Sequence, residues 1–203
     1  MSYRVFGVFL VLAALSVTLY VGLSAAGGQA GFPLDDAWIH QTYARSLAAS
    51  GRMAYVAGQP SAGSTSPLWT LLLSAGYALR IDYRVWTYAL GAAMLALCAW
   101  GVWRLSLRLW PDRPRLALVA GALCAFEWHL GWAAASGMET LLYAALAVAL
   151  IEWAIRAEPG VWGGLIGGAL GGLLTVTRPE GLLLAGLAAA TRLALARRAG
   201  TQA

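Results

Sequence analysis

The stretch VFGVFLVLAALSVTLYVGLS, residues 5–24, decides the class of this protein because it carries no charge and follows a single Arg4. About 20 apolar residues are enough for a helix to cross a bilayer. A secretory signal is the alternative, since Ser24-Ala25-Ala26 offers small residues for cleavage, but signal cores usually run to about 7–15 residues. The longer run favours a retained anchor helix, and either interpretation exports the residues after it.

The whole chain shares this apolar character. Of its 203 residues, 60% are hydrophobic and 11% are charged, whereas soluble domains carry roughly 25% charged residues. All 14 basic residues are arginines that lie between apolar runs, so the net charge of +5 reflects membrane topology and not a nucleic-acid groove. Cys98 and Cys124 each lie inside an apolar run, without metal-site spacing. We therefore expect an integral membrane protein, which argues against a soluble enzyme or a nucleic-acid binder.

Residues 25–66 differ from the apolar segments on either side, because they hold two acidic residues, two arginines, six glycines and two prolines. A short helix is predicted over residues 35–49, since Pro33 and Asp35 suit a helix start. The stretch GQPSAGSTSP, residues 58–67, is typical of turns and loops. We expect a polar exported loop of functional length.

The apolar segments after this loop predict the membrane topology. The run 67–80 is short for a crossing and is expected to be a re-entrant or interfacial helix. Residues 104–115 carry four arginines and residues 192–198 carry three, so both should be cytoplasmic. Because the anchor helix places the loop 25–66 outside, residues 104–115 can be cytoplasmic only if 67–80 does not span and 85–109 does. The remaining apolar runs are 85–109, 115–134, 140–156, 160–177 and 181–196.

The predicted fold class is all-α, a polytopic transmembrane bundle with about six crossings plus one re-entrant or interfacial helix. We expect a single module over 1–203, made of the anchor helix 5–24, an exported loop 25–84 with short helices, and a helical bundle 85–197.

The adjacent acids Asp35 and Asp36 are the first candidate site. Neighbouring carboxylates compete for ionisation, so one can be protonated while the other acts as a base or a ligand. The alternative is a solvated helix N-terminus, where the helix dipole favours acids. His40 lies four residues after Asp36, on the same helical face.

Further polar breaks in the apolar sequence supply the other candidates. Arg178 and Glu180 belong to an RPEG motif, and arginine can grip a lipid phosphate through paired hydrogen bonds or simply snorkel to the interface. Glu139 lies in a GMET motif, and the predicted topology places both this motif and the RPEG motif on the outer face of the membrane. Glu127 and His129 lie within an apolar run, where an ionisable group indicates either a function or a structural hydrogen bond.

Taken in order, these segments resemble a known family. The anchor is followed by LDDAWIHQTYARSLAASGRMAY (34–55), GQPSAGSTSPLWTLLL (58–73), GMET (137–140) and TRPEG (177–181). This order resembles the membrane glycosyltransferases of the C superfamily that use polyprenyl-phosphate sugars. It is similar to bacterial relatives of the mycobacterial terminal arabinofuranosyltransferases and, more distantly, to protein O-mannosyltransferases.

The resemblance implies an inverting sugar transfer on the extracytoplasmic face of the bacterial plasma membrane. Asp35 matches the family's general base, with Asp36 beside it, and Arg178 fits the cation needed near the departing phosphate. The other expected substrate-binding residues are His40, Arg84, Glu139 and Glu180. The implied partners are the lipid bilayer, a polyprenyl-phosphate sugar donor, and a glycan, lipid or protein acceptor of the cell envelope, with no nucleic acid. No organic cofactor is expected, a divalent metal is left open, and no residue is assigned to a metal.

Two other interpretations stand beside this one. A small transporter or channel subunit would use Glu127 and His129 as intramembrane polar sites, and it predicts inverted repeats that the sequence does not display convincingly. The second interpretation is a truncated, non-catalytic fragment of a glycosyltransferase. Members of the family usually continue with further crossings, so we expect this chain to correspond to their N-terminal part.

Overall fold

The computed structural model describes residues 2–156 and 160–200, so the ends of the predicted module 1–203 lie outside the described residues. Most of the described chain is helical. The helices are α1 (Ser2–Ala26), α2 (Asp35–Ser50), α3 (Pro67–Ala78), α4 (Tyr83–Leu109), α5 (Pro114–Phe126), α6 (Trp128–Ala135), α7 (Thr140–Arg156), α8 (Val161–Thr177) and α9 (Gly181–Gly200).

The fold is mainly helical, as predicted, and its described residues include one small hairpin that follows α2. Strand β1 (Ala54–Val56) pairs antiparallel with β2 (Gln59–Pro60). Gly58 supplies the turn with a positive φ of 80°, a conformation that glycine adopts without steric cost. The stretch 58–67, predicted as turns and loops, begins with this turn and the two-residue strand β2, and residues 61–66 lie outside helices and strands.

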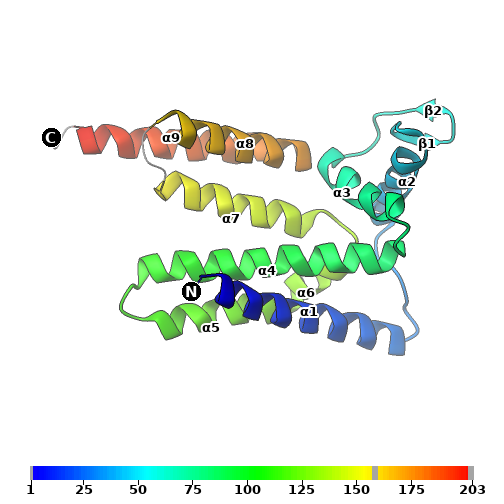
Figure 1. Cartoon of the computed structure of the whole chain (residues 1–203), viewed down its shortest axis with the longest axis horizontal. Helices are drawn as coiled ribbons and strands as arrows, with labels where there is room; N and C mark the ends of the chain where they lie inside the picture. Colours follow the sequence, from blue (N-terminus) through cyan, green and yellow to red (C-terminus); the bar gives the residue numbers. More distant parts are fainter. Residues whose placement is uncertain (1, 157–159, 201–203) are drawn as a thin grey trace.

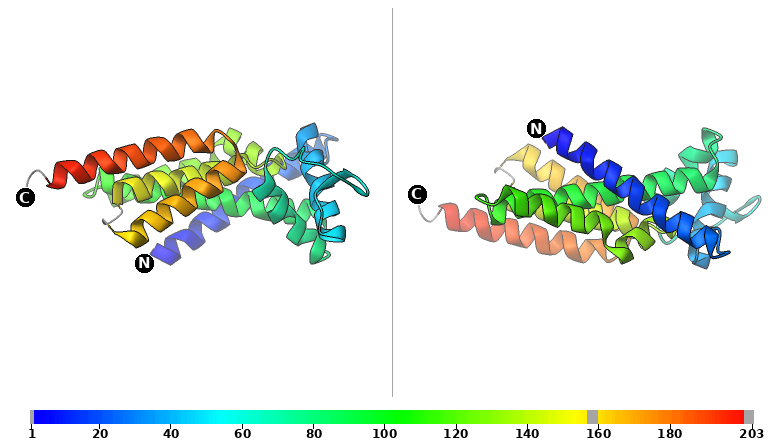
Figure 2. Two further views of the ribbon diagram at one scale, coloured as in Figure 1. Left: turned by 90° about the horizontal axis from the view of Figure 1, so that it is seen from above. Right: turned by 90° about the horizontal axis from the view of Figure 1, so that it is seen from below.

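The long helices lie side by side and alternate in direction along the long axis of the molecule (Figure 1). Helix α1 runs toward the end that holds α2, α3 and the hairpin, α4 runs back, and the later helices repeat this alternation. Helix α4 packs against α1, α5 and α7, and α7 in turn packs against α8 and α9. The views in Figure 2 agree that both termini lie toward the opposite end.

We call one end of the bundle the polar end. It comprises α2, α3, the hairpin and the connections 136–139 and 178–180. Helix α3 has only 12 residues and packs mainly against α2. The polar segments that interrupt the apolar sequence therefore meet at this end, although they are far apart along the chain.

Two described helices, α1 and α4, are long and apolar enough to cross a membrane, and the bent pair α5–α6 would add a third. Six crossings would also require α7, α8 and α9 to span. Helices α7 and α8 have 17 residues each, and α9 has 20 residues that include arginines. Length and composition therefore support membrane association at the level of two or three spans.

The predicted apolar run 115–134 forms two helices, which together are long and apolar enough for one bent span. Helices α5 and α6 meet at an angle of 49°. Glu127 adopts an extended backbone conformation between them, and its carboxylate accepts a hydrogen bond from the backbone N–H of Leu130 at 2.9 Å. The side chain thus caps a new helix, which is the usual role of an acidic residue at that position.

Glycines allow the helices to approach closely. A Cβ on Gly91 of α4 would collide with the backbone carbonyl oxygen of Ala134 in α6, and one on Gly101 would meet the Val148 side chain of α7. Around Gly91 the buried residues Ala13, Leu95 and Ala134 form a continuous core between α1, α4 and α6. Small residues at such positions let helix backbones come together in a membrane.

We predict that Gly91→Ala destabilises the protein by about 1–3 kcal/mol, because the added methyl group meets backbone that cannot rotate away. The thermal unfolding midpoint in detergent measures the effect. Gly22→Ala is the matched control, since Gly22 is an exposed helical glycine and an added methyl group there would meet no atom within 4 Å. Equal midpoints for the two variants would contradict this account of α4–α6 packing.

Candidate functional site

A buried carboxylate organises the polar end. Glu139 is completely buried, in the connection that precedes α7. Its Oε1 accepts a hydrogen bond from Arg178 Nε at 2.6 Å, and its Oε2 lies 3.2 Å from Nε2 of His40, which is also buried. We call His40, Glu139 and Arg178 the carboxylate cluster; it joins α2, the α6–α7 connection and the end of α8.

The cluster is incompletely hydrogen-bonded within the described residues. The contact between His40 and Glu139 is short, but it lacks the direction of a hydrogen bond, so Oε2 of Glu139 and both ring nitrogens of His40 have no hydrogen-bond partner there. The hydroxyl of Ser66, just before α3, is buried and likewise unpartnered. Buried polar groups are nearly always paired, so this concentration marks the polar end as a candidate site.

The charges around Glu139 keep it ionised. Burial by itself raises the pKa of this carboxyl, but the His40 ring and the Arg178 guanidinium both favour the charged form and outweigh burial. The pKa falls from 4.5 to about 2. The hydrogen bond between Arg178 and Glu139 also raises the pKa of Arg178, with a smaller contribution from the negative charge of Glu180.

Local packing fixes the connection that carries Glu139. Gly137 has a φ of +82°, and a Cβ at this position would lie 2.8 Å from Cβ of Ala37 and 2.9 Å from the Phe32 ring. The indole N–H of Trp69 in α3 donates to the carbonyl of Gly137 at 2.9 Å. Only glycine suits this position, where the connection lies directly against α2 and is held by α3.

The acidic pair occupies the first turn of α2. Asp35 and Asp36 are both exposed, and Oδ1 of Asp35 accepts a hydrogen bond from the backbone N–H of Asp36 at 3.0 Å. In the described part of the chain neither acid forms an ion pair, and the charged partner of His40 is Glu139 rather than Asp36. The carboxylates are thus open to solvent, within the same helix as one member of the carboxylate cluster.

The other predicted binding residues, Arg84 and Glu180, form no ion pair with a member of the carboxylate cluster in the described part of the chain. Arg84 is half-exposed at the start of α4, with its Nε 3.6 Å from Oδ1 of Asp82. It borders a cavity of about 340 Å³ between the end of α1 and the start of α4, together with Tyr20 and Tyr88. Glu180 is exposed in the connection after Arg178. Of the predicted residues, the structure joins His40, Glu139 and Arg178.

Sequence reasoning missed a second polar chain in the same region. Gln41 donates to Thr87 Oγ1 at 2.8 Å and accepts from the Tyr77 hydroxyl at 2.9 Å. Gln41 and Tyr77 border a polar cavity of about 270 Å³ that Trp38, Arg45 and others complete. The available sequence signal was the position of Gln41 directly after the candidate residue His40.

Glu127 and His129 do not form an intramembrane site inside the bundle. Their side chains are 2.7 Å apart, from Oε1 of Glu127 to Nδ1 of His129, but both lie at the exposed surface of the α5–α6 bend. Their hydrogen bond, with the cap described above, accounts for both residues structurally.

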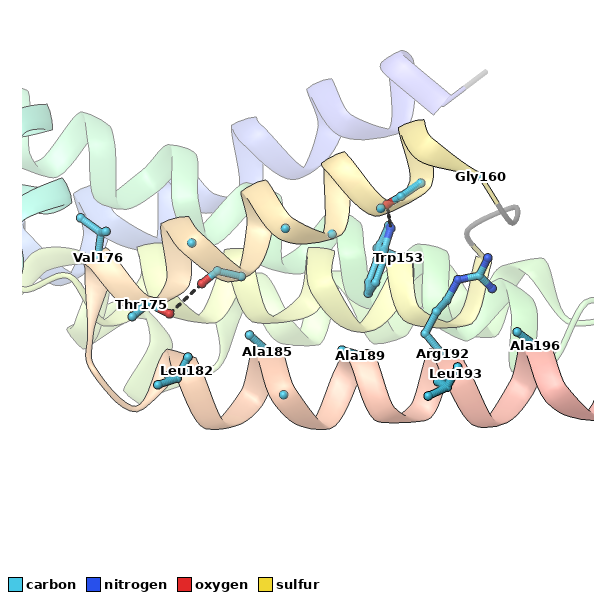
Figure 3. Close-up of a pocket in the computed structure, with 17 residues that line it drawn as sticks. Trp153, Gly160, Thr175, Val176, Leu182, Ala185, Ala189, Arg192, Leu193 and Ala196 are labelled. Atoms are coloured by element: carbon cyan, nitrogen blue, oxygen red, sulfur yellow. Dashed lines mark hydrogen bonds between the residues drawn. The ribbon is translucent and has the colours of Figure 1, made fainter.

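An apolar groove of about 910 Å³ lies between α8 and α9 and is also lined by Trp153 of α7 (Figure 3). The glycines of α8 fall into two rows with different surroundings. Gly167 fits against Trp153 and Gly171 against Ala185, whereas the other row, Gly164, Gly168 and Gly172, has open space at its Cβ positions. Among the described residues that line the groove there is no acid and no histidine, so the carboxylate cluster and not this groove is the candidate reactive site.

Across residues 2–156 and 160–200, no group of three or more His, Cys, Asp or Glu side chains is arranged to hold a metal ion. Comparison of the chain with protein-family models, with curated proteins and with solved structures gives no match. The site is therefore interpreted from its own geometry and from its sequence.

We predict a pH dependence of stability that Glu139 controls. Because its folded pKa is lowered from 4.5 to about 2, the stabilisation is fully present above pH 4.5 and is lost as the pH falls toward 2. The wild-type protein should lose about 2 kcal/mol from this group between pH 6 and pH 3. Glu139→Gln should lack this part of the pH dependence.

Denaturant unfolding in detergent at the two pH values measures the difference. Glu180→Gln is the control, because Glu180 is an exposed neighbour in the same polar end, and it should behave like the wild type. If Glu139→Gln and Glu180→Gln show the same pH dependence, the ionised, paired state of Glu139 is refuted.

Proposed function

We propose that this chain is a membrane glycosyltransferase, or the N-terminal part of one, that moves a sugar from a polyprenyl-phosphate donor to an acceptor hydroxyl on the extracytoplasmic face. The observation that carries the proposal is the convergence of the motif residues at the polar end. The acids of α2, the buried Glu139 and the cation Arg178 come from distant parts of the chain. The resemblance of these motifs to the C superfamily supplies the reaction class.

The alternating helices fit the topology that this function needs. If α1, α4, α5–α6, α7, α8 and α9 each cross once, the polar end is exported and the arginines near residues 104–115 and 192–197 face the cytoplasm. That arrangement obeys the tendency of cytoplasmic segments to carry excess arginine. Helix α3 then lies at the exported surface without crossing.

In the proposed reaction Asp35 acts as the general base. Its carboxylate removes the proton from the acceptor hydroxyl while that oxygen attacks the anomeric carbon of the donor sugar. The bond between this carbon and the phosphate oxygen breaks, and polyprenyl phosphate leaves with the bonding electron pair. The sugar configuration is inverted because attack comes from the face opposite the phosphate.

Arg178 suits the departing phosphate. Its Nε is engaged by Glu139, which orients the guanidinium, while 44% of the side chain stays exposed. Arginine has five N–H donors in a fixed plane, so its terminal nitrogens can bind phosphate oxygens while Nε holds the carboxylate. Glu139 is then a positioning residue that fixes the cation.

The groove between α8 and α9 suits the isoprenoid chain of the donor. One end of the groove is bordered by Thr175, Val176 and Leu182, close in sequence to Arg178, and the other by Arg192 (Figure 3). A lipid lying in it would bring its phosphate toward the polar end. The transporter alternative gains no support, because Glu127 and His129 lie at the surface of the bundle.

We predict that Asp35→Asn lowers sugar transfer about 10²–10⁴-fold, the usual cost of losing a general base. The assay uses membranes with matched amounts of each variant, supplied with polyprenyl phosphate carrying radiolabelled arabinose or mannose, and measures release of polyprenyl phosphate. Asp36→Asn should cost less. Asp112→Asn, the same change in the connection at the opposite end, should leave turnover unchanged.

The outcomes separate the possible failures. A larger loss in Asp36→Asn would move the base by one residue. Wild-type turnover in Asp35→Asn would refute the proposed mechanism. The use of these donors would be refuted if, with both of them, polyprenyl phosphate is released no faster than in membranes without the protein.

A further inference from the structure

A second ionic cluster lies at the end of the bundle opposite the polar end. Glu152, one turn before the end of α7, has a side chain only 11% exposed. Its Oε1 forms an ion pair with Arg104 of α4, whose Nε lies 2.7 Å away, and accepts a hydrogen bond from Nη1 of Arg156 in α7, also at 2.7 Å. The Arg104 guanidinium also lies over the Trp100 ring, 4.4 Å from its centroid. We call Arg104, Glu152 and Arg156 the arginine cluster.

The arginine cluster has an excess of one positive charge. Two guanidinium groups share a single carboxylate oxygen, and their side chains remain 25% and 40% exposed. Each guanidinium has five N–H donors, of which the carboxylate contact uses only a part. Partly buried cations are costly without counter-charge, so this arrangement favours a further anion.

Two apolar grooves lead away from the arginine cluster along α7. One, of about 230 Å³, lies between α4 and α7 and is lined by residues such as Met94, Leu97 and Leu146. The other, of about 430 Å³, lies between α7 and α8 and is lined by residues such as Ile166 and Leu170. Ala149 and Glu152 border both grooves, which therefore meet at the cluster.

We propose that the arginine cluster binds the phosphate of an anionic phospholipid, whose two acyl chains lie in the grooves on either side of α7. Charge complementarity identifies the headgroup, since the cluster carries a net positive charge. The paired apolar grooves identify a two-chain lipid instead of a free phosphate. Basic pockets between helices near the cytoplasmic surface are suited to such lipids. This inference does not depend on the glycosyltransferase proposal.

The experiment measures lipid binding to the purified protein by native mass spectrometry. The protein in detergent is titrated with dioleoyl-phosphatidylglycerol or with dioleoyl-phosphatidylcholine, which differ in headgroup charge and share the same chains. The wild type should prefer phosphatidylglycerol. Arg156→Gln should weaken phosphatidylglycerol binding about fivefold, the effect of one surface cation on an anionic lipid, and leave phosphatidylcholine binding unchanged.

Two further variants separate lipid binding from general charge and from structure. Arg108→Gln removes an exposed arginine near the same end of α4 and should change phosphatidylglycerol binding less than twofold. Glu152→Gln raises the net charge of the cluster, so it should bind phosphatidylglycerol at least as tightly as the wild type. If the cluster only ties α4 to α7, Glu152→Gln should instead lose binding as Arg156→Gln does.

Several results would overturn the proposal. The first two are equal affinity of the wild type for the two lipids, and equal losses of phosphatidylglycerol binding in Arg108→Gln and Arg156→Gln. The others are weaker phosphatidylglycerol binding in Glu152→Gln than in the wild type, and displacement of phosphatidylglycerol by equimolar glycerol 3-phosphate. Elution volume and thermal midpoint establish that each variant is folded. If Arg156→Gln does not fold, the Glu152→Gln titration decides the question alone.

Discussion

A carboxylate that is completely removed from solvent must be paired, and at Glu139 this requirement shapes the whole polar end. Its partners, His40 and Arg178, belong to α2 and to the end of α8. The pairing can be made only if α2 folds back over the bundle and the α8–α9 turn lies beside the α6–α7 connection. Gly137 allows the close approach, because any larger residue would meet α2. The exposed acids of α2 are positioned as a consequence.

The apolar runs predicted most helices well, because burial in lipid or protein needs continuous apolar sequence of a given length. The run 140–156 coincides with α7. The bend at Glu127 was missed because a capping carboxylate and an intramembrane one look alike in sequence. The candidate residues His40, Glu139 and Arg178 could be singled out individually, but their mutual contacts depend on tertiary packing. Local spacing predicted His40 beside Asp36, whereas the structure pairs it with Glu139.

Helix α7 connects the carboxylate cluster and the arginine cluster. Glu139 immediately precedes it, and Glu152 lies near its other end. One carboxylate ties the helix to α2 and α8, and the other ties it to α4. A buried carboxylate at each end fixes the rotation of α7 more sharply than apolar packing alone, since a rotated helix would leave an uncompensated charge. Glu152 was overlooked in the sequence, although an acid in an apolar run is itself a signal.

The most direct test of the central claim is a double-mutant cycle on Glu139 and Arg178, measured as the free energy of unfolding in detergent. Removing one partner of a buried ion pair typically costs about 3–5 kcal/mol because the other charge is left unpaired. We predict that Arg178→Gln is strongly destabilising and that adding Glu139→Gln restores much of the loss. Losses that simply add in the double variant would show that the two residues are not coupled, and would contradict the central role of this pair.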